Sequence, residues 1–460
     1  MMSSHSAAGT PAPATLTSRR ATFAAFAGAF LEWYDFWVFG TAAALVFPQV
    51  FFPEAPPTVA LMQSFGTFAV AFLARPVGAI LFGHFGDRVG RKPVLLVTVF
   101  LIGGGTFLMG LLPSHAVAGS LGAVALIILR VVQGVGIGGE YGGGSLLALE
   151  NAPKNGRGLA GSFHQLGTPA ALLASTGIFA LVEQLPEEDL LSWGWRIPFL
   201  VSGPLLLLGF YIRKNLPETA AFQKDTTRAK SAPLISLLRE QPKMVLIGIG
   251  ARMADAVTFN VVNVFAVSWV TSTMGMSSDA ILTGFVISSA VQLVVLPAAG
   301  RISDRIGRRP VYLTGLAICA TGGGMLYFPV LSTGSTAGTW AMIIVVHAFG
   351  TGLMFGIQSA LFAELFQTRM RYTGLGIVYQ GSALLGGGPT PMIVVFLTAA
   401  AGSWWPAGAY LFAACALSAL CIWRAGETFH KELAETTSDS SERVADDAQG
   451  TAADQEVQSP

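Results

Sequence analysis

Twelve stretches of mostly apolar residues, each close to the length of a membrane-spanning helix, dominate this sequence. A helix that crosses a bilayer needs about 20 predominantly apolar residues, and Gly and Pro are frequent within such helices. The first stretch is too long for a secretion signal and is predicted to be retained. The sequence therefore predicts an all-α integral membrane protein with twelve transmembrane helices, at 22–47, 59–83, 93–113, 117–146, 158–182, 196–212, 244–271, 280–300, 310–330, 338–362, 372–399 and 405–424.

The composition fits this class and argues against several others. Hydrophobic residues make up 52% of the chain and charged residues only 12%, which is unlike a soluble protein. The net charge of +1 gives no basic field that would favour nucleic-acid binding. Cys319, Cys415 and Cys421 lack the spacing of a disulfide framework or a zinc site and are predicted to be packing residues. We expect no metal and no cofactor.

Positive residues predict how the chain is oriented and divided. Of the 27 Lys and Arg residues, 23 fall at the termini or in the loops that follow even-numbered spans, which places both termini in the cytoplasm. A polar segment separates spans six and seven, and the acidic tail is predicted to be disordered. The predicted divisions are a cytoplasmic segment (1–21), a six-helix bundle (22–212), a central loop (213–243), a second six-helix bundle (244–424) and the tail (425–460).

An internal repeat supports two related halves. The segment Gly83–Leu95 (GHFGDRVGRKPVL) matches Gly300–Leu313 (GRISDRIGRRPVYL), and Asp87 aligns with Asp304 at an offset of 217 residues. Repeats of this kind are common in transporters, which place the substrate site near the midplane where the halves meet. The sequence therefore predicts two pseudo-symmetric bundles around a central site.

These motifs resemble a known family. The loops after spans two and eight resemble the signature of the major facilitator superfamily over almost all of residues 18–425. More specific strings resemble the metabolite:proton symporter family, namely Leu31–Phe36 (LEWYDF), Leu73–Gly78 (LARPVG), Arg130–Gly143 (RVVQGVGIGGEYGG) and Ser192–Phe199 (SWGWRIPF). The start of the chain (FAGAFLEWYDF), residues 152–155 (APKN) and residues 376–380 (GIVYQ) are closest in appearance to its shikimate transporter subgroup. The resemblance implies a monomeric carrier of the bacterial inner membrane, driven by a proton gradient without a cofactor.

Charged residues within the spans are candidates for proton coupling. Such a residue costs about 2.5 to 3.5 kcal/mol at a helix centre, so it needs an interior partner or a function. Asp35 in span one and Arg130 in span four are expected to form a pair that opens when Asp35 takes a proton, with Glu32 as a helper. The alternative is an ion pair that only fastens the first bundle. The chain departs from the family in having Glu32 and Asp255 where Asp and Glu are expected.

Polar residues in the second bundle and around span five are candidates for substrate binding. Arg252 offers bidentate geometry to a carboxylate, although a local Arg252–Asp255 ion pair is the alternative. Hydrogen bonds to the substrate or between helices are expected from the other members. The predicted substrate-binding set is Arg130, Gln133, His164, Gln165, Arg252, Asp255, Asn260, Asn263, His347, Gln358, Tyr379 and Gln380.

A third group is predicted to gate the cytoplasmic side. In the two repeated loops the aspartates can pair with arginines or cap a neighbouring helix, whereas positive-inside anchoring alone explains only the arginines. Glu140 is expected in an inner gate or a structural network, and Arg75 is expected at a similar depth. The predicted gating set is Arg75, Asp87, Arg88, Arg91, Glu140, Asp304, Arg305 and Arg308.

Together these features predict a symporter that imports a small organic acid with protons. Shikimate or a related hydroxylated carboxylate is the favoured substrate, and 2-oxoglutarate, citrate, proline or betaine are alternatives within the family. The glycine-rich stretch of span four lies inside an apolar segment, where it suits helix packing better than phosphate binding, so ATP-driven transport is disfavoured. A channel and a membrane enzyme are the remaining alternatives from other classes.

Overall fold

The computed structural model describes residues 14–215, 233–274 and 278–429, and helices are the only regular elements within these ranges. Eleven helical stretches are long and apolar enough to cross a membrane by length and composition. A twelfth long helix, α1, carries Glu32 and Asp35, and these two carboxylates lower its hydropathy. The prediction of an all-α fold built from membrane-spanning helices is confirmed.

Most spans of the first half are single long helices. Short helices at their ends form the connections. The elements are α1 (Ala14–Leu45), α2 (Phe47–Phe51), α3 (Pro57–Arg88), α4 (Arg91–Gly110), α5 (His115–Ala118), α6 (Leu121–Glu150), η1 (Lys154–Gly156), α7 (Arg157–Gln165), α8 (Gly167–Val182), α9 (Glu187–Asp189), η2 (Leu190–Gly194), α10 (Arg196–Leu200) and α11 (Ser202–Lys214).

The helices of the second half are more often interrupted. The elements are α13 (Pro233–Glu240), α14 (Pro242–Asn260), η3 (Val261–Phe265), α15 (Ala266–Met274), α16 (Ser278–Ile306), α17 (Arg308–Ile318), η4 (Cys319–Leu326), α18 (Tyr327–Leu331), α19 (Thr336–Ile343), η5 (Ile344–Thr351), α20 (Gly352–Ala363), η6 (Thr368–Met370), α21 (Arg371–Ser382), η7 (Ala383–Gly387), α22 (Thr390–Ala401) and α23 (Trp405–Ala425). Segments η3, η4, η5 and η7 are π-helical turns within spans. Nothing in the hydropathy pattern of the sequence predicts these turns.

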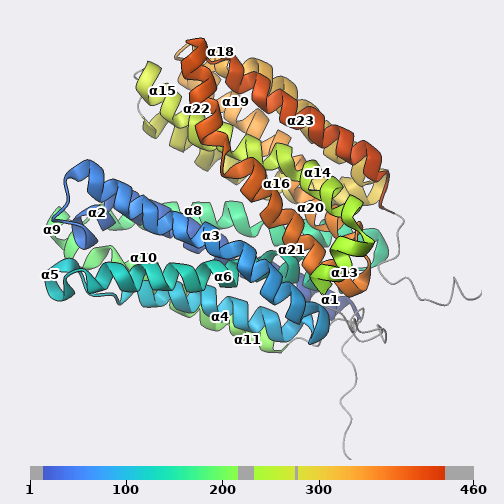
Figure 1. Cartoon of the computed structure of the whole chain (residues 1–460), viewed down its shortest axis with the longest axis horizontal. Helices are drawn as coiled ribbons and strands as arrows, with labels where there is room; N and C mark the ends of the chain where they lie inside the picture. Colours follow the sequence, from blue (N-terminus) through green and yellow to red (C-terminus); the bar gives the residue numbers. More distant parts are fainter. Residues whose placement is uncertain (1–13, 216–232, 275–277, 430–460) are drawn as a thin grey trace, which may run out of the picture.

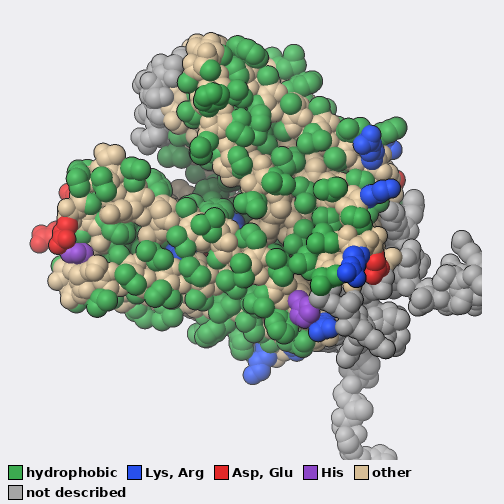
Figure 2. All heavy atoms as spheres, viewed as in Figure 1, with side chains coloured by type: hydrophobic (Ala, Val, Ile, Leu, Met, Phe, Trp, Pro, Cys, Tyr) green, Lys and Arg blue, Asp and Glu red, His purple; other side chains and the backbone are tan. Residues whose placement is uncertain are grey.

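The spans form two lobes that meet at one end and separate at the other (Figure 1). The N lobe contains α1 to α11, and the C lobe contains α14 to α23. Between the lobes, α7 packs against α16 and α20, while α21 packs against α3 and α6. We call the end that carries α13 and the start of α1 the joined end, and the end that carries α2, α5 and α18 the open end. Figure 2 shows the surface hollowed between the lobes toward the open end.

The buried cores, like the lobes, are joined at one end of the molecule and separate at the other. One continuous apolar cluster runs through the C lobe and crosses into the N lobe at the joined end, where it includes Phe82, Tyr141 and Leu149. A second cluster, rich in aromatic rings such as Phe47 and Trp195, fills the N lobe near the open end and includes no residue of the C lobe. The shared core therefore lies at the joined end, and each lobe is packed separately beyond it.

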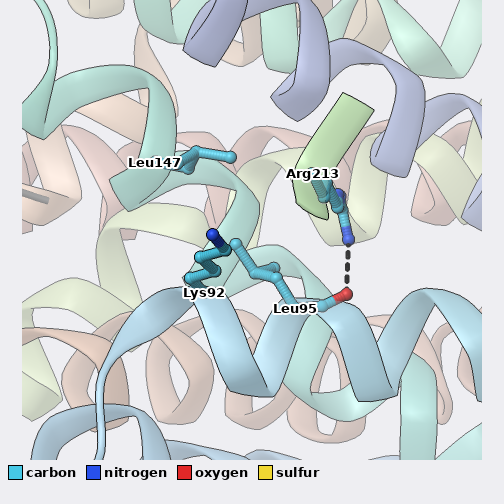
Figure 3. Close-up of a pocket in the computed structure, with 4 residues that line it drawn as sticks. All are labelled: Lys92, Leu95, Leu147 and Arg213. Carbon is cyan, nitrogen blue, oxygen red and sulfur yellow. Dashed lines mark hydrogen bonds between the residues drawn. The ribbon is translucent and has the colours of Figure 1, made fainter. Parts of the chain in front are cut away.

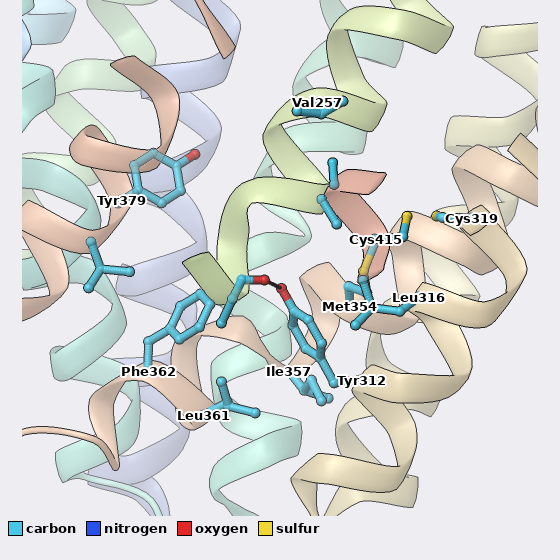
Figure 4. Packing of buried hydrophobic residues seen from close by; sticks show 14 of the residues in the cluster. Val257, Tyr312, Leu316, Cys319, Met354, Ile357, Leu361, Phe362, Tyr379 and Cys415 are labelled. Atoms are coloured by element: carbon cyan, nitrogen blue, oxygen red, sulfur yellow. Dashed lines mark hydrogen bonds between the residues drawn. The ribbon is translucent and has the colours of Figure 1, made fainter. Parts of the chain in front are cut away.

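Tight side-chain packing holds the C lobe together (Figure 4). Leu316, Ile357 and Tyr312 belong to this core, and the Tyr312 ring centroid lies 6.3 Å from that of Phe362. The Tyr312 hydroxyl donates to the Ala251 carbonyl oxygen at 2.9 Å. In a bilayer the lipid tails are as apolar as the helices, so helix association depends on such packing and on hydrogen bonds between helices. This core fixes α14 against α17 and α20 and thereby positions the polar residues of α14.

Candidate functional site

A fully buried polar network lies inside the N lobe around Asp35 of α1. Arg130 of α6 donates from Nη1 to Asp35 Oδ2 at 2.8 Å, and neither side chain is exposed. The other carboxylate oxygen accepts from Thr106 Oγ1 at 2.9 Å and from Gln133 Nε2 at 2.8 Å. The predicted Asp35–Arg130 pair is therefore present in the structure, with two further donors on the same carboxylate.

The guanidinium of Arg130 is only partly satisfied by this network. It lies over the ring of Phe39, with Cζ 3.9 Å from the ring centroid. Its Nη1 also donates to Gln133 Oε1 at 2.9 Å, whereas Nη2 and Nε are buried and have no hydrogen-bond partner in the part of the chain that the structure describes. Because Arg130 is held by one nitrogen, it keeps donors for a second anion.

Glu32 is buried one helical turn from Asp35, within electrostatic reach of Arg75.

A second buried arginine lies in the C lobe on α14. Arg252 forms an ion pair with Asp255, with 3.3 Å between Nη2 and Oδ2, and donates from Nη1 to Ser382 Oγ at 2.8 Å. Its Nε donates to Gln358 Oε1 at 3.4 Å. The local ion pair considered as the alternative for these two residues is thus present, and it coexists with contacts to α20 and α21.

An aromatic stack connects Arg252 to the N lobe. The guanidinium lies over the ring of Tyr379 at 3.7 Å, and that ring stacks on Tyr141 of α6 with 3.7 Å between centroids. The Tyr141 hydroxyl accepts from Gln165 Nε2 of α7 at 3.3 Å. Because Tyr379 belongs to the C lobe and Tyr141 to the N lobe, this stack crosses the interface between them.

The other predicted substrate residues divide into two groups. Asn263, Gln358 and Gln380 each bury an amide nitrogen that has no hydrogen-bond partner within the described residues. The remainder are engaged between or within helices. These contacts are His164 Nδ1 with the Ala25 carbonyl (3.1 Å), His347 Nδ1 with Ser288 Oγ (3.0 Å) and Asn260 Nδ2 with the Ala256 carbonyl (2.9 Å).

At the joined end, Asp87 of α3 caps the start of α21 in the opposite lobe. Its carboxylate accepts from the backbone nitrogens of Tyr372 and Thr373 at 3.2 and 3.1 Å, and from Thr373 Oγ1 at 2.8 Å. A carboxylate at a helix N-terminus satisfies free N–H groups and interacts favourably with the helix dipole. The predicted role of the repeated aspartates as helix caps has a direct structural counterpart here.

Asp304 of α16 makes the reciprocal contact. It accepts from the backbone nitrogens of Gly158 and Leu159, at the start of α7, at 2.7 and 2.9 Å. Beside it the backbones of Gly158 and Gly300 approach so closely that a Cβ on either glycine would meet the carbonyl oxygen of the other. The two repeated loops thus cap helices of the opposite lobes in a pseudo-symmetric way.

Buried arginines and two glutamates surround these caps. Arg91 lies 3.7 Å from Asp87 and 3.5 Å from Glu150, while Arg308 lies 2.7 Å from Asp304 and 3.3 Å from Glu364. Sequence reasoning missed both glutamates. The signal that could have revealed them is a second repeat, SLLALE at Ser145–Glu150 and SALFAE at Ser359–Glu364.

Four of the predicted gating residues lie outside this cross-lobe network, namely Arg75, Arg88, Arg305 and Glu140. Arg88 and Arg305 are exposed, and Arg88 shares a hydrogen bond with His84 at 3.3 Å. Arg75 is buried and lies over the ring of Phe72, with 4.2 Å between its Cζ and the ring centroid.

Glu140 belongs to a network inside the N lobe. It binds Arg213 of α11 through both carboxylate oxygens and accepts from Thr98 Oγ1 at 2.9 Å. Arg213 also donates to the Leu95 carbonyl at 2.9 Å, beside a cavity of about 10 Å³ that Lys92 and Leu147 complete (Figure 3). That volume holds about one water molecule, so this cavity is no substrate site. Sequence reasoning missed Arg213, because which helix meets Glu140 is a tertiary property.

Comparison with known proteins decides the family. Residues 20–233 match the family described as Sugar (and other) transporter, and residues 249–446 match the Major Facilitator Superfamily. The Shikimate transporter of Escherichia coli (strain K12) is 38% identical over 409 residues, which cover 88% of this chain and 93% of that protein. The chain belongs to the major facilitator superfamily. The Proline/betaine transporter of Salmonella typhimurium is 32% identical, over 82% of this chain and 77% of the relative.

Solved structures of this superfamily share the fold. The proton:xylose symporter XylE bound to 6-bromo-6-deoxy-D-glucose matches with a TM-score of 0.77 at 19% identity, covering 92% of this chain and 98% of XylE. An inward open conformation of XylE matches with a TM-score of 0.61. The chain is therefore a multi-pass membrane transporter with the twelve-helix fold of the superfamily. It is not an enzyme, and within its described residues no cluster of His, Cys, Asp and Glu side chains has the arrangement of a metal site.

Proposed function

We propose that this chain is a proton-coupled symporter that imports a small organic acid, with shikimate or a related hydroxylated carboxylate as the favoured substrate. It works as a monomer in a bacterial inner membrane, and its bundles at 22–212 and 244–424 rock about a central site. The observation that carries the proposal is the Asp35–Arg130 pair, sealed from solvent within a membrane span. A buried acid–arginine pair in the bilayer is a functional site by default.

The orientation follows from the basic residues. If the loops with Lys and Arg are cytoplasmic, the joined end faces the cytoplasm and the open end faces outward. The structure then represents a carrier that is open to the outside and closed to the inside. The apolar core shared at the joined end supports this assignment.

Protonation of Asp35 supplies the coupling step. A neutral Asp35 no longer balances the charge of Arg130, so the arginine is free to bind an oxygen-bearing group of the substrate. Within the described residues its Nη2 and Nε have no hydrogen-bond partner, and they are available to an oxygen of that group. Thr106 and Gln133 remain as partners for the protonated acid. Loss of the proton on the cytoplasmic side restores the pair and weakens substrate binding, with Glu32 as a helper nearby.

Polar groups of the C lobe support an oxygen-rich substrate. Arg252 provides a second cation, and the amide nitrogens of Asn263 and Gln380, which have no hydrogen-bond partner within the described residues, are donors that hydroxyl or carboxylate oxygens would satisfy. The identity of 38% to a protein named Shikimate transporter points to the same chemistry. Relatives named Proline/betaine transporter, at 32% identity, favour a zwitterion as the second candidate.

The test is uptake into proteoliposomes. Purified protein should accumulate labelled shikimate only under an inward proton gradient, and unlabelled shikimate should compete better than 2-oxoglutarate, citrate, proline or betaine. An Asp35→Asn variant should lose accumulation but keep exchange of internal for external substrate. The matched control is Glu54→Gln, because Glu54 is an exposed carboxylate at the open end.

Three results would contradict parts of the proposal. Normal accumulation by Asp35→Asn would remove the proton role from this residue, and accumulation of one of the competitors in place of shikimate would replace the substrate. Absence of gradient-driven uptake for every compound tested would overturn the symport mechanism.

A further inference from the structure

Asp255 is a buried carboxylate of the C lobe to which the coupling step above gives no role. It lies one turn after Arg252 on α14, and 11% of its side chain is exposed, whereas the Asp35 side chain is completely enclosed. An ionised carboxylate inside a membrane span is unfavourable unless a cation balances it. The charge state of Asp255 therefore depends on what Arg252 is doing.

The surroundings of Asp255 contain one strong counter-charge. Among the charged groups that act on Asp255 in the described part of the chain, Arg252 is the cation. The other titratable or polar side chains of the described residues that lie within its electrostatic reach come from five elements. They are Gln358 of α20, Tyr312 of α17, Cys319 of η4, Tyr141 of α6 and Tyr379 of α21.

Arg252 does not need Asp255 to keep its position. Its Nη1 donates to Ser382 Oγ at 2.8 Å and to the Tyr379 carbonyl at 3.2 Å, and its Nε donates to Gln358 Oε1. The plane of the guanidinium also rests on the Tyr379 ring. Only Nη2 serves Asp255, at 3.3 Å. An incoming carboxylate that takes Nη2 would find the arginine already oriented.

Displacement of Asp255 by such an anion links two binding events. With Nη2 taken, the Asp255 carboxylate would remain buried without a counter-charge, and binding a proton removes that charge. We propose that Asp255 is a second proton carrier, which takes up a proton when a substrate carboxylate replaces it on Arg252 and releases that proton when the substrate leaves. This inference rests on the proposed function and adds a second proton to the one on Asp35.

The test is the pH dependence of substrate binding to the purified full-length protein. For each proton that binds together with the substrate, the substrate affinity falls about tenfold for every unit by which the pH rises. This holds over the pH range in which the acid is ionised in the free protein and protonated in the complex. Labelled shikimate is the probe, or the competitor that the uptake assay shows to be transported. Wild-type affinity should fall about a hundredfold per pH unit, and Asp255→Asn affinity about tenfold.

Matched variants identify which residue carries the second proton. Asp35→Asn should also leave a tenfold dependence per pH unit, the double variant should bind independently of pH, and Asp255→Glu, which keeps the carboxyl group, should restore the wild-type dependence. An Asp255→Asn variant with the full wild-type dependence would overturn the inference. A wild-type affinity that falls only about tenfold per pH unit, in a protein that accumulates substrate normally, would also overturn the inference. That result would leave the proposed function intact. Wild-type protein without any gradient-driven uptake would instead overturn the proposed function.

Discussion

Asp87→Asn should open the joined end without abolishing substrate binding. In the structure the Asp87 carboxylate accepts two backbone hydrogen bonds and one hydroxyl hydrogen bond from the start of α21 in the other lobe. An asparagine of the same size keeps an acceptor but loses the charge. Because the lobes must separate here when the carrier opens inward, the variant should favour the inward-open state and slow the complete transport cycle.

The magnitude follows from these contacts. A hydrogen bond to a charged group contributes about 1.5 to 3 kcal/mol and a neutral one about 0.5 to 1.5, so each bond loses roughly 1 kcal/mol. The lost interaction with the helix dipole adds about 0.3 to 1 kcal/mol. In the opened state water replaces the partners and little is lost. The joined form should therefore be disfavoured by about 3 to 4 kcal/mol, or roughly 140- to 700-fold in population.

A single reporter cysteine measures this shift. Ser145 and Ser359 face each other across the lobes with 3.1 Å between their hydroxyl oxygens, so Ser145→Cys in a background without the three native cysteines is buried until the joined end opens. Its labelling rate with a membrane-impermeant maleimide reports the opened fraction. Asp87→Asn should raise that rate and Glu54→Gln should not. A rate for Asp87→Asn equal to that of the parent, with substrate binding intact, would refute a role of this cap in closure.

Three further changes probe the same structure. Arg130→Ala should lose both accumulation and exchange in proteoliposomes, because Arg130 is the cation that forms the ion pair with Asp35; retained exchange would place the substrate elsewhere. Gly158→Ala should speed labelling of the reporter cysteine, because the new Cβ would meet the Gly300 carbonyl, whereas Gly177→Ala should not, because a Cβ there meets nothing within 4 Å. Burial raises the pKa of Glu364 above its ordinary value of 4.5. A raised pKa in the folded state contributes stability that is present below the unfolded value and is lost as the pH rises through the folded value. The Tm of the wild type minus the Tm of Glu364→Gln should therefore decrease as the pH rises from below 4.5. A Tm difference that does not change with pH would contradict this reasoning.

The helices and the caps could be predicted because their signals are local or repeated. Hydropathy marks each span without knowledge of its neighbours, and the repeat placed Asp87 and Asp304 in equivalent loops. Glu150 and Glu364 carried the same kind of signal, in the pair SLLALE and SALFAE, and were missed only because that pair was not compared.

Other parts of the candidate site carried no signal in the sequence. Tyr141 stands in a glycine-rich stretch, and nothing in its neighbourhood along the chain indicates that it stacks on Tyr379, which is far away in sequence. Arg213 was counted with the central loop, although its side chain is buried against Glu140 of α6. Such pairings depend on how the helices are arranged in space, which periodicity and hydropathy do not specify.

The two lobes share their caps but differ in their buried acid–arginine pairs, and this difference bears on energetics. Asp35 and Arg130 are enclosed within one lobe, whereas Arg252 and Asp255 lie against the Tyr379–Tyr141 stack that crosses the interface. If both acids carry protons, import of a monoanion such as shikimate moves one net positive charge inward. The membrane potential would then add about 2.3 kcal/mol per 100 mV to the driving force, whereas one proton per monoanion would add nothing. Accumulation of shikimate should therefore rise when an inside-negative potential is imposed at constant pH gradient, and Asp255→Asn should accumulate it independently of the potential. Equal voltage dependence in both proteins would assign the second charge to a group other than Asp255.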